Sequence, residues 1–238
     1  MGETVGYELD EGIATITIDD GKVNAFSIDT LTALHGALDR AESDDAVVVL
    51  TGREGCFTAG FDLKVFAGGE VEQILRMLNL GATLAERVMG FPTPVLIAST
   101  GHAVAAGAFL LLAADVRIGT DGDYRTGLNE VAIGLAVPRF VIEIASRRLH
   151  PGHFPRAVID AAIYTPAEAV AVGYYDAVIS PGELRAHSLA EAARLAQLDR
   201  AAYAETKSRA RSQALEAIRA AIEGELSADG LAGARPPL

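Results

Sequence analysis

Two short apolar runs in this chain each end in a turn of very small residues, and a segment able to begin a helix follows each turn. The first run, 47–50, leads to the turn at 56–63, and the second run, 95–98, leads to the turn at 101–107. Small side chains let a ligand approach the backbone closely, and amides at the start of a helix point outward with a partial positive charge. Two such turns facing one point would form an oxyanion hole for a carbonyl oxygen that gains charge during a reaction.

Segments with strand-like and helix-like patterns alternate through most of the chain. Continuous β-branched runs are typical of strands buried on both faces of a sheet, whereas apolar residues at helical spacing indicate amphipathic helices. We expect a hairpin at 7–19, a helix at 28–41 capped by Ser27, strands at 47–51, 95–99 and 116–119, and helices at 71–89 and 103–114. The alternation predicts an α/β fold. Periodicity alone does not distinguish a doubly wound sheet from a spiral of repeated ββα units.

The C-terminal part of the chain is helical in pattern and shows no further strand signal. Its main segment, 186–226, is rich in alanine and leucine and follows a core whose predicted elements are already complete. Amphipathic helices without an internal partner bury their apolar face against another subunit. We therefore divide the chain into a core, 1–180, and a C-terminal helical oligomerisation region, 181–238, and expect an oligomer.

Composition limits the partners of such a fold. A net charge of −12 argues against a nucleic acid or an anionic membrane, because both need basic surfaces. The longest apolar stretch, 103–114, is too short to span a bilayer, and the N-terminus has no signal-peptide pattern. The lone cysteine, Cys56, excludes an internal disulfide and suits a reducing compartment, so we expect a cytoplasmic protein. His150 and His153 flank a helix-breaking Pro-Gly pair, and no metal site is expected.

Five sequence blocks, in a fixed order, make the chain resemble the crotonase family, also called the enoyl-CoA hydratase/isomerase superfamily. The blocks are 22–26, 57–63, 101–107 with Asp115, 129–134, and 165–169 with Gly173. The last block also has the pattern of a capping box, with a glycine placed to end the short helix. The similarity extends from about Val5 to Ile179. It implies a spiral of repeated ββα units and C-terminal helices that pack across a trimer interface, often in a dimer of trimers.

By this resemblance, the two oxyanion amides belong to Phe61 and Ala106. The family usually has glycine at the second position, so an alanine there must avoid left-handed backbone angles. A thioester carbonyl held by two amides has a more acidic α-carbon, because the charge of the enolate falls on the bound oxygen. The resemblance makes Glu130 the acid/base that moves the α-proton, and an apolar cleft would raise the pKa of its carboxyl.

The chain departs from the hydratase pattern at Phe109. Hydratases of this family carry a second glutamate at that position, and the two acids together handle the water. A single glutamate beneath an oxyanion hole resembles the Δ3,Δ2-enoyl-CoA isomerases, which move a proton from C2 to C4. We therefore expect enoyl-CoA isomerisation, with an enoyl-CoA hydratase (a lyase of fatty-acid β-oxidation) and a non-catalytic acyl-CoA-binding protein as alternatives. A serine hydrolase fits less well, because the chain has no Gly-x-Ser-x-Gly elbow.

The resemblance also places residues around an acyl-CoA thioester substrate. Lys22 lies where the family has a basic residue near the nucleotide or pantetheine entrance, unless it is simply a turn lysine. Lys207 would reach a phosphate, unless it lies on a solvated helix face, and Asp62 is more consistent with a helix cap than with chemistry. The expected contacts with CoA or substrate are Lys22, Val23, Ala25, Ala59, Gly60, Asp62, Leu63, Val104, Gly107, Phe109, Asn129, Gly134 and Lys207. Coenzyme A is part of the substrate, and no separate cofactor is expected.

Overall fold

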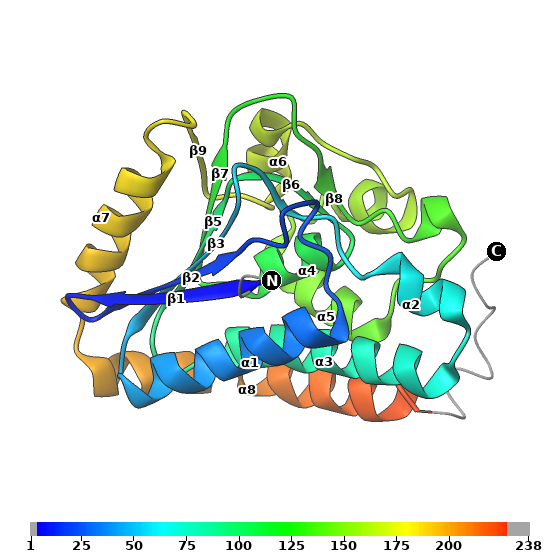
Figure 1. Ribbon diagram of the computed structural model, residues 1–238, viewed down its shortest axis with the longest axis horizontal. Helices are drawn as coiled ribbons and strands as arrows, with labels where there is room; N and C mark the ends of the chain where they lie inside the picture. The colour runs from blue at the N-terminus through cyan, green and yellow to red at the C-terminus, as the bar shows by residue number, and fades with distance from the viewer. Residues whose placement is uncertain (1–3, 228–238) are drawn as a thin grey trace.

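The computed structural model describes residues 4–227, and its larger sheet has six strands (Figure 1). In the strand order β1-β2-β3-β5-β7-β9, the first two strands form an antiparallel hairpin and every later pair is parallel. The strands are Val5–Asp10 (β1), Ile13–Ile18 (β2), Val47–Gly52 (β3), Val95–Ser99 (β5), Val116–Thr120 (β7) and Ala177–Ile179 (β9). The predicted hairpin, the three predicted strands and the α/β class are confirmed.

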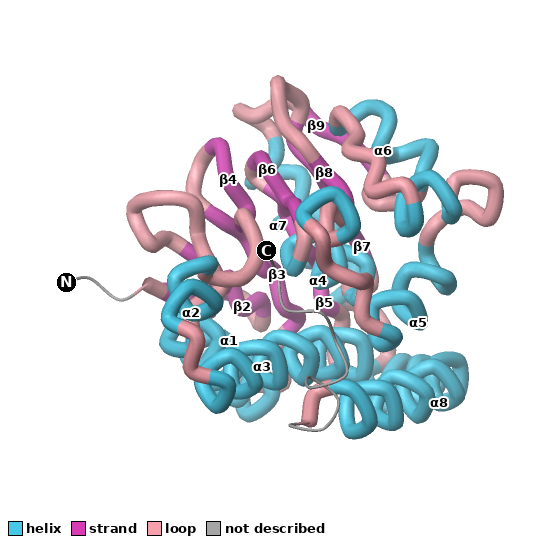
Figure 2. The backbone as a smooth tube through the Cα atoms, turned by 90° about the vertical axis from the view of Figure 1, so that its right-hand side faces the viewer, coloured by secondary structure: helices cyan, strands magenta, loops and turns pink. Residues whose placement is uncertain are grey.

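A second, smaller sheet has three parallel strands in the order β4-β6-β8 (Figure 2). They are Gly55–Thr58 (β4), Gly101–Val104 (β6) and Thr126–Gly127 (β8). Each follows directly after a strand of the larger sheet, so the chain enters the two sheets in turn, and helical segments come after each pair of strands. This order agrees with the repeated ββα units that the resemblance implied.

The predicted helix over 103–114 is wrong at its N-terminal end. Ala103 belongs to β6, because it pairs with Thr58 of β4 on one side and with Thr126 of β8 on the other. The helix that follows, α4, covers only Ala106–Ala113. A run of small apolar residues has no period that separates a buried strand from a buried helix, which is why the sequence pattern joined the two elements.

Three long helices, α1, α3 and α8, lie along one side of the molecule (Figures 1 and 2). Ser27 caps α1, because its side chain accepts a hydrogen bond from the Thr30 amide. Thr165 closes the predicted capping box of α6, and Gly173 caps the C-terminal end of that helix. The helices are Ile28–Ser43 (α1), Leu63–Gly68 (α2), Val71–Gly90 (α3), Ala106–Ala113 (α4), Arg139–Arg148 (α5), Pro166–Val172 (α6), Leu184–Ala196 (α7) and Arg200–Glu225 (α8), with a 3-10 turn at Val131–Ile133 (η1) and a π-helical segment at Pro155–Ile159 (η2).

The central strands of the larger sheet have buried side chains on both faces. Ile16 and Leu50 point to the face that packs into the main core with α1, α3 and α4. Val49 and Leu96 point to the opposite face, where they pack with Leu184 of α7. Alternate residues of one strand therefore serve two cores, which explains the continuous apolar runs in the sequence.

The C-terminal helices pack against their own chain. α8 lies against α3 and α5, and its Leu215 and Ile218 side chains are buried. The expectation that 186–226 has no internal partner is therefore wrong, because a helical pattern shows an apolar stripe without showing which neighbour covers it. Assembly into a trimer or a dimer of trimers stays a prediction. Within residues 4–227, no helix combines the length and the apolar character needed to cross a bilayer.

Candidate active site

The three strands of the smaller sheet end at one common edge. Because β4, β6 and β8 are parallel neighbours, their carboxyl ends lie side by side (Figure 2). Phe61 comes three residues after β4, Ala106 comes two residues after β6, and Glu130 comes three residues after β8. Ligands of open α/β sheets bind outside the carboxyl ends of the strands. The fold thus brings the two expected oxyanion residues and the expected acid to the same edge.

Gly60 shapes the first turn, where its φ is +91°. Its carbonyl accepts a hydrogen bond from the Phe26 amide at 2.8 Å, and its own amide donates to the Thr58 hydroxyl at 3.0 Å. The next amide, that of Phe61, donates no hydrogen bond within the described part of the chain. It is therefore a donor that a ligand oxygen can use.

Ala105 shapes the second turn, with its backbone at φ +50° and ψ −118°. A residue with a Cβ held in such a region costs on the order of 1–3 kcal/mol. The Ala105 amide donates to the Gly127 carbonyl at 3.0 Å, which ties the turn to the end of β8. Ala106 begins α4, and the first amide of a helix has no acceptor inside the helix. The sequence raised the question of left-handed angles at Ala106, but the strained residue is the one before it.

The two turns touch each other. A Cβ added to Gly60 would lie 3.2 Å from the Ala106 nitrogen and 3.1 Å from the Cβ of Ala105. A Cβ added to Gly107 would lie 2.6 Å from the Thr58 side chain, so a larger residue there would also separate the turns. The small residues that drew attention in the sequence are therefore required by close packing, and this packing brings together the two turns that carry the expected oxyanion amides.

Glu130 is the acid at this edge, and it is 8% exposed. Burial raises the pKa of its carboxyl to about 7, and a backbone hydrogen bond within the same residue lowers it only in part. Its Oε2 atom is buried without a hydrogen-bond partner among the residues that the structure describes. The Glu130 carbonyl accepts from the Leu135 amide at 2.9 Å, which holds the turn around η1. A carboxyl with a pKa near neutrality can both accept and return a proton.

Phe109 fills the position expected for a second acid. It is 2% exposed, and its ring centroid lies 6.0 Å from that of Phe61 and 5.3 Å from that of Phe140. The Phe61 ring also presses on α3, where a Cβ added to Gly81 would lie 2.4 Å from it. An aromatic cluster therefore stands where a hydratase of the expected type would hold a carboxylate and water.

Several residues expected to contact CoA lie in the loops beside the first turn. The Ala59 amide donates to the Val23 carbonyl at 3.0 Å, and Val23 and Leu63 are 53% and 69% exposed. Lys22 is exposed in the same loop as Val23. Asp62 caps α2 by accepting a 2.9 Å hydrogen bond from a backbone amide of that helix, as predicted.

The remaining expected contacts lie close to the strand ends. Ala25 precedes α1, and its amide donates a hydrogen bond to the Asp20 carboxylate of the same loop. Val104 ends β6, and Gly107 lies in the first turn of α4. Asn129 precedes the acid, and its buried Oδ1 has no hydrogen-bond partner within residues 4–227. Gly134 ends η1 with a φ of +82°.

Asn24 supports the site, although the sequence pattern gave it no role. It is fully buried, and its side-chain amide donates to the carbonyls of Ile18, Cys56 and Phe57 at 2.9–3.1 Å. Its carbonyl accepts a 2.6 Å hydrogen bond from the Thr58 hydroxyl. Its φ is +52°, which asparagine tolerates better than most residues. The one signal in the sequence for this supporting role is an asparagine set between the apolar residues Val23 and Ala25.

Lys207 does not lie where a phosphate could reach it. It is 7% exposed, and its Nζ donates to the Asp115 carboxylate at 2.6 Å and to the Thr93 carbonyl at 3.4 Å. Arg211 pairs with the other oxygen of the same carboxylate at 2.8 Å. The expectation that Lys207 contacts CoA is therefore corrected: its ammonium fastens α8 to the segment that follows α4.

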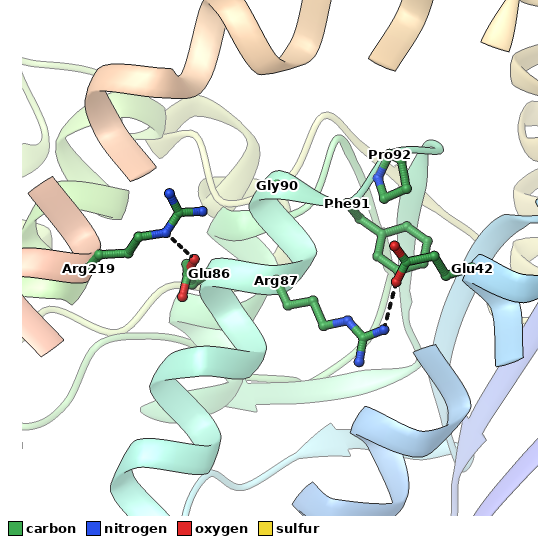
Figure 3. A pocket seen from close by; sticks show the side chains of 7 residues that line it. All are labelled: Glu42, Glu86, Arg87, Gly90, Phe91, Pro92 and Arg219. Carbon is green, nitrogen blue, oxygen red and sulfur yellow. Dashed lines mark hydrogen bonds and ion pairs between the residues drawn. The ribbon is translucent and has the colours of Figure 1, made fainter. Parts of the chain in front are cut away.

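Two cavities of the described structure lie away from the strand ends. One, of about 260 Å³, opens between α1, α3 and α8, where Arg87 pairs with Glu42 and Arg219 pairs with Glu86 (Figure 3). The other, of about 600 Å³, lies between the larger sheet and α7. None of the three residues at the strand ends lines either cavity. We take the edge of the smaller sheet as the candidate active site, because the acid and the free amides are there.

Comparison with known proteins identifies a family. The model of the family described as enoyl-CoA hydratase/isomerase matches residues 8–229. A putative enoyl-CoA hydratase of Thermus thermophilus is 34% identical over 192 residues, which are 78% of this chain and 73% of that protein. Mitochondrial enoyl-CoA delta isomerase 1 of Homo sapiens is 27% identical over 182 residues, which are 75% of this chain and 60% of that protein. A probable enoyl-CoA hydratase of Bacillus subtilis is 33% identical over 141 residues, so that the chain spans only 53% of that protein.

Solved structures share the fold over nearly the whole chain. EchA3 of Mycobacterium tuberculosis, described as a probable enoyl-CoA hydratase, has a TM-score of 0.92 at 40% identity over 96% of this chain and 97% of its own. An apo enoyl-CoA isomerase structure from M. tuberculosis has a TM-score of 0.89 at 39% identity, with coverage of 94% and 98%. Human mitochondrial delta3-delta2-enoyl-CoA isomerase has a TM-score of 0.86 at 26% identity, with coverage of 96% and 93%.

Proposed function

Because the chain belongs to the enoyl-CoA hydratase/isomerase family, we propose that it is an enzyme that binds an acyl-CoA thioester and stabilises its enolate. The single observation that carries this function is the shared edge of β4, β6 and β8, which gathers two amides without partners in residues 4–227 and a buried carboxyl. Amide dipoles that are oriented before the reaction stabilise the charge developing on a carbonyl oxygen.

The reaction that fits this edge best is the isomerisation of a 3-enoyl-CoA to a 2-enoyl-CoA. The thioester oxygen accepts hydrogen bonds from the amides of Phe61 and Ala106. The Glu130 carboxylate removes a proton from C2, and the electron pair of the broken C–H bond delocalises into a dienolate whose charge falls on the bound oxygen. Glu130 then returns the proton to C4, so that the double bond moves and the carboxylate is regenerated.

Phe109 favours isomerisation over hydration. Water addition of the two-acid type needs a second carboxylate, and a buried phenylalanine between two other rings stands at that position. Hydration remains a second candidate, because relatives carry hydratase names and the free Oε2 of Glu130 could activate a water. A protein that binds acyl-CoA without turnover is the third.

The proposed ligand contacts follow the loops around the edge. Exposed Val23 and Leu63 would cover the pantetheine or acyl chain, and Lys22 would meet a phosphate at the entrance. Ala25, Ala59, Gly60, Asp62, Val104, Gly107, Phe109, Asn129 and Gly134 complete the proposed set. Assembly as a trimer or a dimer of trimers and a cytoplasmic location belong to the same proposal.

Product analysis with two substrates tests the reaction. The protein is incubated separately with a trans-3-enoyl-CoA and a trans-2-enoyl-CoA, and products are followed by ultraviolet absorbance and mass. We expect the 3-enoyl substrate to gain the absorbance of a conjugated thioester without a change in mass. A gain of one water from the 2-enoyl substrate, with no isomerisation, would instead assign hydration.

Calorimetry with octanoyl-CoA separates binding from catalysis. Binding without turnover of either substrate would contradict the enzymatic proposal and favour the acyl-CoA-binding alternative. A failure to bind any acyl-CoA would contradict the proposed ligand class itself.

A further inference from the structure

The acid segment is held by a buried phenol that the proposed reaction does not use. Tyr174 is fully buried just after α6, and its hydroxyl accepts a hydrogen bond from the Leu128 amide at 3.3 Å. Leu128 lies between the end of β8 and the acid, two residues before Glu130. We propose that Tyr174 is a positioning residue for Glu130 and that its hydroxyl fixes the segment carrying the carboxyl relative to the oxyanion amides.

The Leu128 amide needs this partner because the smaller sheet has ended. β8 is only two residues long and ends at Gly127, whose carbonyl already accepts the Ala105 amide. Leu128 itself is 0% exposed, so water cannot replace a lost partner without entering the core. A buried amide left without an acceptor is destabilising, because its desolvation is no longer compensated. The phenol thus continues, with a side chain, the pairing that the sheet no longer provides.

Tyr174 also lies within the electrostatic reach of the acid. Burial is the main cause that raises the pKa of Tyr174 above its usual value, and the charge of Glu130 raises it further. The phenol therefore stays neutral wherever Glu130 titrates. It contributes a fixed dipole without becoming a second acid or base, which is consistent with a single proton-transferring group.

The neighbouring tyrosine provides a matched control. Tyr175 is 3% exposed, and its hydroxyl bonds to the side chains of Thr126 and Ser99, each at 3.0 Å. Substitution by phenylalanine therefore removes two buried hydrogen bonds here, against one at Tyr174. Its contact with β8 is upstream of Gly127, however, and does not touch the segment that carries Glu130.

This inference rests on the proposed function, and the experiment keeps the two separable. Tyr174→Phe and Tyr175→Phe are compared with the wild type in kcat and KM for a trans-3-enoyl-CoA, and in melting temperature. The ionisation of Glu130 is read without substrate from the infrared carboxyl band that disappears in Glu130→Gln. Both phenylalanine variants should melt below the wild type, and Tyr175→Phe should lose at least as much as Tyr174→Phe, because it loses two hydrogen bonds.

Only Tyr174→Phe should change the chemistry. We expect its kcat to fall between about tenfold and about hundredfold, because small misplacements of a catalytic group have such effects, with KM nearly unchanged. The pKa of Glu130 should shift, because the segment that carries its buried carboxyl loses its anchor and the surroundings of the carboxyl change. An unchanged pKa of Glu130 in Tyr174→Phe, or the same loss of kcat in Tyr175→Phe, would overturn the inference. Absence of turnover in the wild type would count against the proposed function alone, since the infrared titration needs no substrate.

Discussion

The ionisation of Glu130 couples the proposed chemistry to stability. Burial raises its pKa from 4.5 to about 7, so between these pH values the folded protein keeps a proton that the unfolded chain has released. The free energy of unfolding should therefore fall as the pH rises through this range, by up to about 3 kcal/mol. Chemical denaturation at several pH values should show this slope in the wild type and not in Glu130→Gln. Parallel curves for the two proteins would contradict the burial of a titrating carboxyl.

The same substitution has an expected effect on the rate. The amide of Glu130→Gln keeps the shape of the side chain but cannot accept the C2 proton, and removal of a general base costs about 10²–10⁴ in rate. Affinity for octanoyl-CoA should stay within a few-fold of wild type. In the wild type, kcat/KM should rise with pH through about 7, because the base must be ionised. Activity of the variant close to that of the wild type would remove Glu130 from the mechanism.

Ala105 stores backbone strain next to the amide of Ala106, a proposed oxyanion donor. Its φ of +50° and ψ of −118° disfavour any residue with a Cβ, so Ala105→Gly should raise the free energy of unfolding by about 1 kcal/mol after the entropic cost of glycine is subtracted. Ala108→Gly, in the helix that follows, should lower the free energy of unfolding by about 1 kcal/mol or more. Denaturant titration of both variants would measure these two changes in the free energy of unfolding. A loss of stability in Ala105→Gly would show that the turn is not strained.

At the scale of single residues, the sequence predicted which residues form the candidate site but did not predict their backbone conformations. The small residues around Gly60 and the acid Glu130 were evident from block spacing and resemblance. The left-handed angle at Ala105 and the threefold hydrogen bonding of Asn24 were not, because each is imposed by segments distant in the chain. Local pattern cannot report such constraints.

Phe109 is the position of α4 at which the two proposed reactions would be separated. Phe109→Glu would restore the second acid of the hydratase pattern, and we expect the ratio of hydration to isomerisation to rise in the folded fraction. The cost should be severe, about 3–5 kcal/mol or more, because a carboxyl would replace a ring packed between Phe61 and Phe140. Phe109→Leu serves as the control for lost packing. A folded glutamate variant with the product ratio of the leucine variant would show that this position does not select the reaction.

The Asp115 cluster links α8 to the ends of two other helices. Lys207 and Arg211 share the Asp115 carboxylate, and Arg211 also donates to the Met89 carbonyl near the end of α3. Lys207→Met should lower the free energy of unfolding by about 2 kcal/mol, because Arg211 still neutralises the carboxylate. Affinity for CoA should stay within twofold, as calorimetry would show. A marked loss of CoA affinity in a folded variant would restore the phosphate contact that the buried position of Lys207 argues against.

The boundaries of helices were predictable from the sequence where a capping residue or a helical spacing of apolar residues marks them locally. Ser27 and the capping box of Thr165 mark helix starts that the structure confirms. The division of 103–114 into β6 and α4 was not predictable, because pairing with β4 and β8 decides it. The packing of α8 on α3 and α5 was likewise outside the reach of an amphipathic pattern.

For the whole molecule, the site exists only once the smaller sheet has formed. Its strands come from separate parts of the chain, and the turn at Gly60, the turn at Ala105 and the acid at Glu130 meet because β4, β6 and β8 are neighbours. The order of the sequence blocks, through the family resemblance, predicted that these two turns and the acid belong to one site. Physical reasoning about single segments predicted each turn. It did not predict that the two turns touch, because pairing between distant strands has no local signature in the sequence.

Assembly is the last consequence of the whole chain. α7 and α8 already pack on their own subunit. Contacts between subunits would therefore use the surface of the molecule that remains exposed after this packing, including the outer faces of these helices. Each chain carries a net charge of −12, and copies therefore repel at low ionic strength. We expect light scattering at micromolar concentration to give three or six times 24.9 kDa, with a larger assembled fraction at about 0.15 M salt than at about 0.01 M salt. A mass near that of one chain under both conditions would contradict the trimer and leave an active site built by a single subunit.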